Sequence, residues 1–119
     1  MSFPLVSMCG SYHATKGWYP RCASSWDRIR GTEKMVVLDD GTLTDDDQGR
    51  IESWGYEVWS IEMVNEQVEP ALRSYPALRT LREKSPLFRK IVDPNILFAD
   101  EERVLFMDSD IYVRGAVKL

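Results

Sequence analysis

The 119-residue sequence lacks the features that mark membrane, secreted and disulfide-rich proteins. Its apolar runs fall far short of the ~20 residues that a membrane-spanning helix requires. Its first residues contain neither the basic nor the long apolar region of a signal peptide. Its two cysteines, Cys9 and Cys22, form neither a CxxC pair nor part of a His/Cys cluster. We therefore expect no transmembrane segment, reduced thiols and a cytoplasmic location.

Basic residues are also fewer than acidic ones. The 15 Lys and Arg residues are outnumbered by 19 Asp and Glu residues, which gives a net charge of -4. This balance argues against a protein that binds nucleic acid through bulk positive charge. What the chain does have is 44% hydrophobic residues, including 4 Trp, 5 Tyr and 4 Phe. That content suits the core of one globular domain.

Short apolar segments alternate with segments of helical periodicity. The apolar segments predict strands at residues 4–9, 35–38, 58–61 and 104–107. The segments between them predict helices. The first covers residues 19–29 and ends near Gly31, and the second runs from the N-cap Thr44 to Gly55. The third covers residues 66–85, interrupted at Pro70 and Pro76, and the fourth runs from Ser85 to Pro94. This alternation predicts an α/β fold, a Rossmann-like three-layer α/β/α arrangement with a mostly parallel sheet.

Polar residues follow three of these strands. In open α/β sheets, ligands bind beyond the carboxyl ends of the strands, which parallel pairing brings to one edge. The residues there are Gly10, Ser11, Tyr12 and His13 after the first strand, Asp39, Asp40, Gly41 and Thr42 after the second, and Asp108, Ser109 and Asp110 after the last. We expect them to converge on one site. Tyr12 has two interpretations, as a ring that stacks on a nucleobase or as a packing residue.

The acids Asp108 and Asp110 are separated by one residue and follow a run of four apolar residues. Where the backbone turns, two such carboxylates can reach one cation, and their oxygens suit Mg²⁺ or Mn²⁺. Such an ion commonly bridges a protein carboxylate to a substrate diphosphate. An acidic loop without a ligand is the alternative interpretation, because acids are common in turns.

A cluster of basic residues precedes the last strand. Between residues 73 and 90 the chain has Arg73, Arg79, Arg82, Lys84, Arg89 and Lys90, with Glu83 as the one acid. A diphosphate needs positive side chains. Arg89 and Lys90 are the best placed for this, because their helix leads toward the last strand. We expect Arg79, Arg82 and Lys84 on a solvated helix face.

Two segments resemble GT-A glycosyltransferases. DDGT (residues 39–42) after an apolar strand resembles their nucleotide-binding loop. PLFRKIVDP (residues 86–94), followed by VLFMDSDIYV (residues 104–113), resembles the segment that leads into their DxD motif. The resemblance implies a site for Mn²⁺ or Mg²⁺ and for a nucleotide-diphosphate sugar, with a UDP-sugar preferred over a GDP-sugar. It implies that the DxD acids hold the metal, with Asp110 coordinating it directly and Asp108 contacting either the metal or the ribose.

Further roles follow from the same resemblance. The donor-binding residues that it implies are Gly10, Ser11, Tyr12, Asp39 or Asp40 at the base or ribose, and Arg89 or Lys90 at phosphate or sugar. In GT-A enzymes the acceptor-binding half and any catalytic base follow the DxD motif, whereas here only residues 111–119 follow it. We therefore expect residues 1–119 to be the donor-binding part of a truncated GT-A domain, with its catalytic residues and acceptor unassigned.

Two other functions remain open. A haloacid-dehalogenase-type phosphatase also places Asp-x-Asp after an apolar strand, with the first Asp as nucleophile. Ile111 and Tyr112, however, depart from the residues that follow the phosphatase motif. A non-catalytic nucleotide- or metal-binding module, or an interaction module, would need no further catalytic residues.

Overall fold

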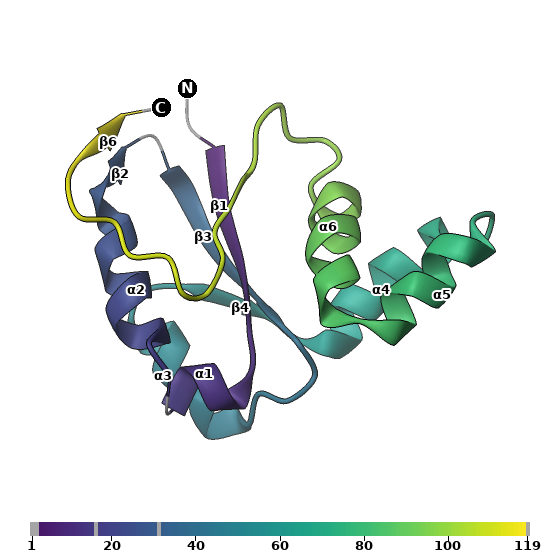
Figure 1. The fold of residues 1–119 in the computed structure, drawn as a ribbon, viewed down its shortest axis with the longest axis horizontal. Coiled ribbons are helices and arrows are strands. Elements are labelled where there is room, and N and C mark those ends of the chain that lie inside the picture. The colour runs from purple at the N-terminus through teal and green to yellow at the C-terminus, as the bar shows by residue number, and fades with distance from the viewer. Residues whose placement is uncertain (1–2, 16, 31, 119) are drawn as a thin grey trace.

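The computed structural model describes residues 3–15, 17–30 and 32–118 and shows an α/β fold (Figure 1). Four parallel strands form the central sheet in the order β4-β3-β1-β5. The bounds of these strands are Phe3–Cys9 for β1, Thr32–Asp39 for β3, Glu57–Trp59 for β4 and Leu105–Phe106 for β5. A second, two-stranded sheet is formed by β2 (Ile29–Arg30) and β6 (Val117–Lys118). The predicted fold class is confirmed.

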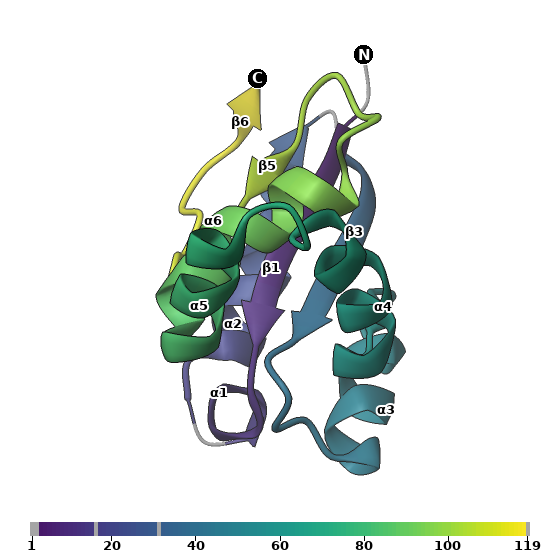
Figure 2. The same ribbon diagram turned by 90° about the vertical axis from the view of Figure 1, so that its right-hand side faces the viewer.

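Helices cover both faces of the central sheet (Figures 1 and 2). The helices on one face are α1 (Ser11–Thr15), α2 (Tyr19–Ser25) and α3 (Asp45–Ser53). Those on the other face are α4 (Ile61–Ala71), α5 (Pro76–Lys84) and α6 (Pro86–Leu97). Each face has its own apolar core. Within the described ranges, no helix has the length and apolar character needed to cross a membrane.

The strand β1 lies inside the sheet, between β3 and β5, and its seven residues are all buried. Leu5 and Cys9 belong to the core beneath α1, α2 and α3. Val6 and Met8 belong to the core on the opposite face, beneath α4 and α6. A strand that is apolar on both faces is stable only between two helical layers, which is why the run of apolar residues in β1 predicts a central parallel strand.

The order of the strands places a topological switch point beside β1. The chain passes from β1 to β3 and β4 on one side, and then returns to β5 on the other side of β1. In sheets of this kind a crevice opens between the carboxyl ends of the strands where the order reverses. The loops that follow β1 and β5 therefore flank the expected ligand position.

The helix predicted over residues 19–29 is too long. α2 ends at Ser25, a 3₁₀ turn (Trp26–Arg28) follows it, and Ile29 begins β2. The cause is a long-range contact, because the segment that follows β5 returns to this region and pairs its strand β6 with β2. Gly31, the predicted end of the helix, lies outside the described residues.

Two strand boundaries also differ from the prediction. The strand predicted at residues 58–61 ends at Trp59, because Ser60 is the N-cap of α4 and its hydroxyl accepts the N–H of Met63 at 3.2 Å. An N-cap Ser satisfies a backbone donor that the helix itself leaves unpaired. The strand predicted at residues 104–107 is shorter than expected, since β5 has only two residues.

The prolines divide into two kinds. Pro86 lies in the first turn of α6, as predicted from its position after Ser85, and Pro76, which was predicted to interrupt a helix, begins α5; a missing N–H costs nothing at either position. Pro70 and Pro94, which were expected to interrupt or end helices, lie inside α4 and α6 instead. α6 continues to Leu97, because residues at its carboxyl end pack into the core on that face of the sheet. Packing there outweighs the helix-breaking tendency of proline.

Candidate functional site

The loops that follow β1 and β3 are fastened together by hydrogen bonds. The N–H of Ser11 donates to Thr42 Oγ1 at 3.0 Å, and that hydroxyl donates to Asp40 Oδ1 at 2.6 Å. Gly10 lies so close that a Cβ placed on it would be 2.2 Å from Asp40 Oδ2. A side chain at residue 10 would therefore force the side chains of Asp40 and Thr42 to move.

The carboxylate of Asp39 shapes the loop after β3. Its Oδ1 accepts the N–H of Gly41 at 2.7 Å and the N–H of Leu43 at 3.2 Å. Gly41 has a φ of +101°, a conformation that side chains disfavour. Asp39 is buried whereas Asp40 is partly exposed. Of the two acids predicted to contact a base or ribose, Asp40 is the one within reach of solvent.

Ser11 is anchored by an acid that the sequence analysis did not select. Its hydroxyl donates to the buried carboxylate of Asp47, and this hydrogen bond is the main reason that the pKa of Asp47 is lowered. Asp47 also forms a capping box with Thr44, which accepts the Asp47 N–H at 3.1 Å and donates its own N–H to Asp47 Oδ2 at 3.0 Å. The Thr-x-x-Asp spacing was the signal available for this role.

Arg89 reaches from α6 to the end of β3. Its guanidinium donates to the carbonyl oxygens of Asp40 at 2.9 Å and Asp39 at 3.3 Å. Its Nε lies 3.6 Å from the buried carboxylate of Asp93. Arg89 therefore ties α6 to the loop after β3. The structure places it beside the predicted site with its donors directed at the protein itself.

Lys90 and Asp108 form an ion pair at the switch point. Lys90 Nζ lies 2.7 Å from Asp108 Oδ1, and the two side chains are 28% and 51% exposed. This contact joins the basic helix to the DxD segment. Both partners are open to solvent. A phosphate could therefore replace Asp108 as the partner of Lys90, and a cation could replace Lys90 as the partner of Asp108.

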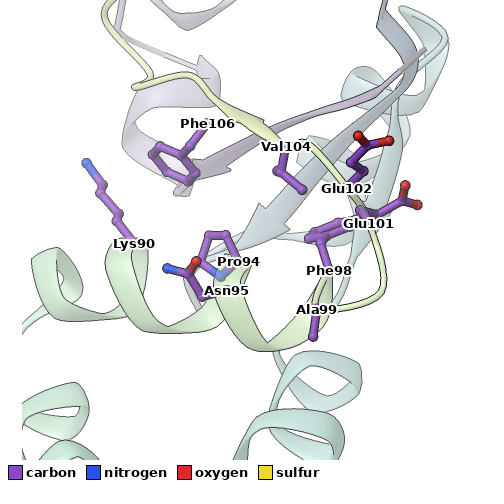
Figure 3. Close-up of a pocket in the computed structure, with 9 residues that line it drawn as sticks. All are labelled: Lys90, Pro94, Asn95, Phe98, Ala99, Glu101, Glu102, Val104 and Phe106. Atoms are coloured by element: carbon purple, nitrogen blue, oxygen red, sulfur yellow. The ribbon is translucent and has the colours of Figure 1, made fainter. Parts of the chain in front are cut away.

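A cavity of about 340 Å³ extends from Lys90 between α6 and the segment that leads into β5 (Figure 3). Figure 3 shows Lys90 at one end and the carboxylates of Glu101 and Glu102 at the other. Its other lining residues are Pro94, Asn95, Phe98, Ala99, Val104 and Phe106. The cationic end of this cavity therefore adjoins the Lys90–Asp108 pair, and its middle is largely apolar.

Asp110 has different neighbours from Asp108. The chain turns after Asp108, whose carbonyl accepts the Ile111 N–H at 3.2 Å. Asp110 is exposed, and its charge adds to the effect of burial in raising the pKa of the Cys22 thiol on α2. Asp108 meanwhile pairs with Lys90 on α6. The structure thus places both predicted metal ligands on one exposed turn, with Asp108 paired to Lys90 and Asp110 near enough to α2 to influence Cys22.

The described part of the chain contains no group of three or more His, Cys, Asp or Glu side chains that could hold a metal ion. Asp108 and Asp110 still have the donor chemistry that Mg²⁺ or Mn²⁺ requires, since such ions are often held by one or two carboxylates and by substrate phosphates. The two residues therefore fit a metal that shares its coordination with a diphosphate.

Tyr12 lies on α1, the short helix that follows β1. Its side chain is 68% exposed, so packing against the sheet does not account for it. The ring of His13 stands edge-on to it, with ring centroids 5.6 Å apart. Tyr12 is thus an accessible aromatic surface in the loop region after β1.

Cys9 lies at the carboxyl end of β1, yet it is not a candidate nucleophile. Burial raises the pKa of its thiol to about 12, with further contributions from Asp40, Asp47 and Asp39. A thiol needs a lowered pKa to react as a thiolate near neutral pH. Cys9 is therefore a core residue.

The prediction that Arg82 lies on a solvated face is wrong. Arg82 is buried and donates from Nε to Asp93 Oδ1 at 2.7 Å. Arg79, on the same helix, is 53% exposed and pairs with Glu69 at 3.1 Å, as expected for a surface position. Arg82 is drawn inward because the carboxylate of Asp93 on α6 is itself buried and needs a partner.

The carboxyl edge of the sheet therefore brings together most of the predicted residues. Gly10, Ser11, Asp39 and Asp40 form its interlocked loops, Arg89 braces those loops, and Lys90 and Asp108 are paired and accessible. Comparisons of the chain with protein-family models, with curated proteins and with solved structures found no match, so its function is inferred from the site itself.

Proposed function

We propose that this chain binds a nucleotide-diphosphate sugar at the carboxyl edge of its sheet, as the donor-binding part of a GT-A-like glycosyltransferase. The observation that carries the proposal is the Lys90–Asp108 pair, a partly exposed cation and carboxylate at the switch point. A diphosphate with its metal has the complementary charges, because phosphate can pair with the ammonium group and the metal with the carboxylate. The resemblance of residues 86–113 to the DxD region of GT-A enzymes supports the same role.

Each residue of the site has a proposed task. Lys90 would hold a phosphate, and Asp108 and Asp110 would hold Mn²⁺ or Mg²⁺ together with oxygens of the diphosphate. When bound, such a metal acts as a Lewis acid that stabilises charge on the leaving diphosphate. Tyr12 offers a face for the base, since aromatic rings stack on nucleobases. Asp40 is the candidate contact for the ribose.

Arg89 has an indirect task. It holds the carbonyl oxygens of Asp39 and Asp40, which fixes the distance between α6 and the loop after β3. Because Lys90 is the next residue on the same helix, this contact also positions the ammonium group at the switch point. Arg89 is therefore proposed as a positioning residue.

Titration calorimetry of UDP and GDP, with and without Mn²⁺, tests this function. We expect binding that requires Mn²⁺, favours UDP, and weakens about tenfold or more in Asp108→Asn and Lys90→Met, since each substitution removes a charged partner. Asp100→Asn is the matched control, because Asp100 is an exposed acid in the loop before β5. Circular dichroism confirms that each variant is folded. A folded protein that binds neither nucleotide in the presence of Mn²⁺ would refute the proposal.

A non-catalytic binding module is the second candidate function. It is favoured by the ion pair of Asp108 with Lys90, which already satisfies one of the two predicted metal ligands. Such a module would bind nucleotide without hydrolysing or transferring the sugar of a UDP-sugar. Release of free sugar from UDP-glucose, measured by chromatography, would exclude the binding module, and hydrolysis of p-nitrophenyl phosphate would favour the phosphatase interpretation instead.

The cytoplasm is the proposed location. Cys9 and Cys22 are both free and buried, as expected of thiols in a reducing compartment.

A further inference from the structure

A small cavity lies between α2 and the turn that joins α3 to β4, on the face of the sheet that these helices share (Figure 1). It encloses about 170 Å³, and its lining residues are Pro20, Ser24, Asp27, Trp54 and Tyr56. The first three are spaced by four and three residues, so they lie on one face of α2 and of the 3₁₀ turn that continues it. The two aromatic residues flank Gly55, whose φ of +89° turns the chain from α3 into β4. We call this cavity the aromatic pocket.

The rings of Trp54 and Tyr56 form two walls of the aromatic pocket that stand nearly at right angles. Their centroids are 6.3 Å apart and their planes meet at 84°. The hydroxyl of Tyr56 donates to the carbonyl of Ala23 on α2, which fixes the Tyr56 ring to the opposite wall. Behind Trp54 lies the buried ring of Tyr19, with the two centroids 6.3 Å apart. Both aromatic walls are therefore held in place by the protein itself, so a ligand need not order them.

A carboxylate stands beside these rings. Asp27 is exposed, and none of the described side chains forms an ion pair with it. Burial and then the charge of Asp27 raise the pKa of Tyr56, which agrees with the position of this carboxylate near the Tyr56 ring. Of the described residues that line the pocket, none is basic. The pocket therefore combines the negative faces of two aromatic rings with an unpaired negative charge.

We infer that the aromatic pocket binds a quaternary ammonium group, such as the trimethylammonium group of choline. Aromatic faces attract such a cation, and the carboxylate adds a full charge of the right sign. The cation has no N–H donors, so it enters the pocket without leaving a hydrogen-bonding group unpaired. The volume of about 170 Å³ is below the roughly 300 Å³ of pockets that enclose whole drug-sized ligands. The pocket therefore suits the head group of a ligand.

Other cations match the lining less well. Mg²⁺ and Ca²⁺ require several oxygen ligands, whereas the polar side chains of the lining are Ser24, Asp27, Tyr56 and the indole N–H of Trp54. The Tyr56 hydroxyl already donates to Ala23, and the Ser24 hydroxyl donates to the carbonyl of Arg21 at 2.9 Å. A primary ammonium has three N–H donors and a guanidinium has five, so either would be left with unpaired donors in the pocket.

The aromatic pocket is separate from the proposed nucleotide site. None of its lining residues is among those proposed to hold the nucleotide or its metal. Binding of a quaternary ammonium group can therefore be tested whether or not the chain binds UDP.

NMR titration of the full chain with choline tests the inference, and the tert-butyl analogue of choline is the matched control ligand. In this analogue carbon replaces the quaternary nitrogen, so the shape is kept and the charge is lost. We expect choline to shift the indole N–H resonance of Trp54 and to bind about tenfold or more tightly than the analogue. The indole resonances of Trp18, Trp26 and Trp59 are internal references, because these residues do not line the pocket.

Variants locate the site through saturation transfer from the protein to the methyl protons of choline. Asp27→Asn should weaken binding about fivefold or more, because it removes the charge at an exposed position. Trp54→Leu should weaken it about tenfold or more, because it removes one aromatic wall. Asp46→Asn, at an exposed acid on α3 that does not line the pocket, should leave binding unchanged. The indole resonances of Trp26 and Trp59 report whether each variant is folded.

A trimethylammonium group can belong to a soluble ligand or to a lipid headgroup. Cosedimentation with phosphatidylcholine vesicles distinguishes them, because vesicle binding that free choline displaces assigns the group to a lipid, and choline binding without vesicle binding assigns it to a soluble ligand. Either result supports the inference.

Three outcomes would overturn the inference. The first is equal binding of choline and its tert-butyl analogue, and the second is choline binding that a folded Asp27→Asn variant retains in full. The third is tighter binding of methylammonium or methylguanidinium than of choline, which would assign the pocket to a lysine-like or arginine-like group.

Discussion

Replacing Arg82 by methionine removes a guanidinium that joins α4, α5 and α6. Arg82 donates two hydrogen bonds to Asp93 on α6, at 2.7 Å and 2.9 Å. It also donates to Asn65 at 2.9 Å and lies 3.4 Å from Glu69, both on α4. Asp93 is fully buried, so the substitution leaves its carboxylate with Arg89 alone, at 3.6 Å.

The expected loss of stability is large for a single substitution. Removing one member of a buried ion pair costs about 3–5 kcal/mol, because the remaining charge stays desolvated. For a chain of this size each kcal/mol lowers the melting temperature by about 4 °C, so Arg82→Met should melt about 12–20 °C below the unmodified protein. Methionine keeps much of the side-chain volume, which confines the change to the lost charge and hydrogen bonds.

Urea unfolding followed by tryptophan fluorescence measures this loss, and Arg79→Met is the matched control. Arg79 lies on the same helix and pairs with Glu69 and Glu83, but it is 53% exposed. Exposed ion pairs contribute at most about 1 kcal/mol. If Arg82→Met lowers the free energy of unfolding by no more than Arg79→Met does, the reasoning about the buried network is refuted.

Three further predictions concern Asp47, the two cysteines and Ser25. Asp47→Asn should destabilise the protein at pH 7 and make its stability less sensitive to acid, because folding lowers the pKa of Asp47. The stability that this carboxylate contributes is present above about pH 4 and is lost as the pH falls through the pKa of the folded state, which urea unfolding at several pH values can test. Cys9 and Cys22, both buried with raised pKa, should react with DTNB at pH 8 only after urea unfolding, and rapid reaction of the native protein would contradict their burial. Ser25→Ala should leave the buried Val113 N–H without its acceptor, cost about 1–3 kcal/mol, and speed hydrogen exchange in the segment after β5, whereas unchanged exchange would show that this contact does not hold the segment.

Much of the candidate site could be predicted because its residues follow strands. The apolar run before Asp108 identifies a buried strand, and parallel pairing then carries the end of that strand to the same edge as the loops after β1 and β3. The pairing of Lys90 with Asp108 agrees with the position of the basic helix just before that strand. Which atoms each residue uses could not be predicted. The donors of Arg89 are directed to backbone carbonyls, a choice that depends on the distance between two packed elements.

Local interactions are what the sequence by itself determined. Three features depend on residues that are close together in the chain. They are the apolar character of β1 on both faces, the N-cap Ser85 with Pro86 after it, and the alternation of strands and helices. Hydrophobic periodicity and capping act over a few residues, so they can be recognised without knowledge of the fold.

Tertiary structure alone decided the environment of the charged residues. Arg79 and Arg82 are three residues apart on α5, yet one is exposed and the other is buried against Asp93. Asp108 and Asp110 flank one residue, yet their charges act on opposite helical layers. The energy of a charge depends on how much water surrounds it and on which partners lie within a few ångströms. Those partners come from elements distant in the sequence, so only the folded chain determines them.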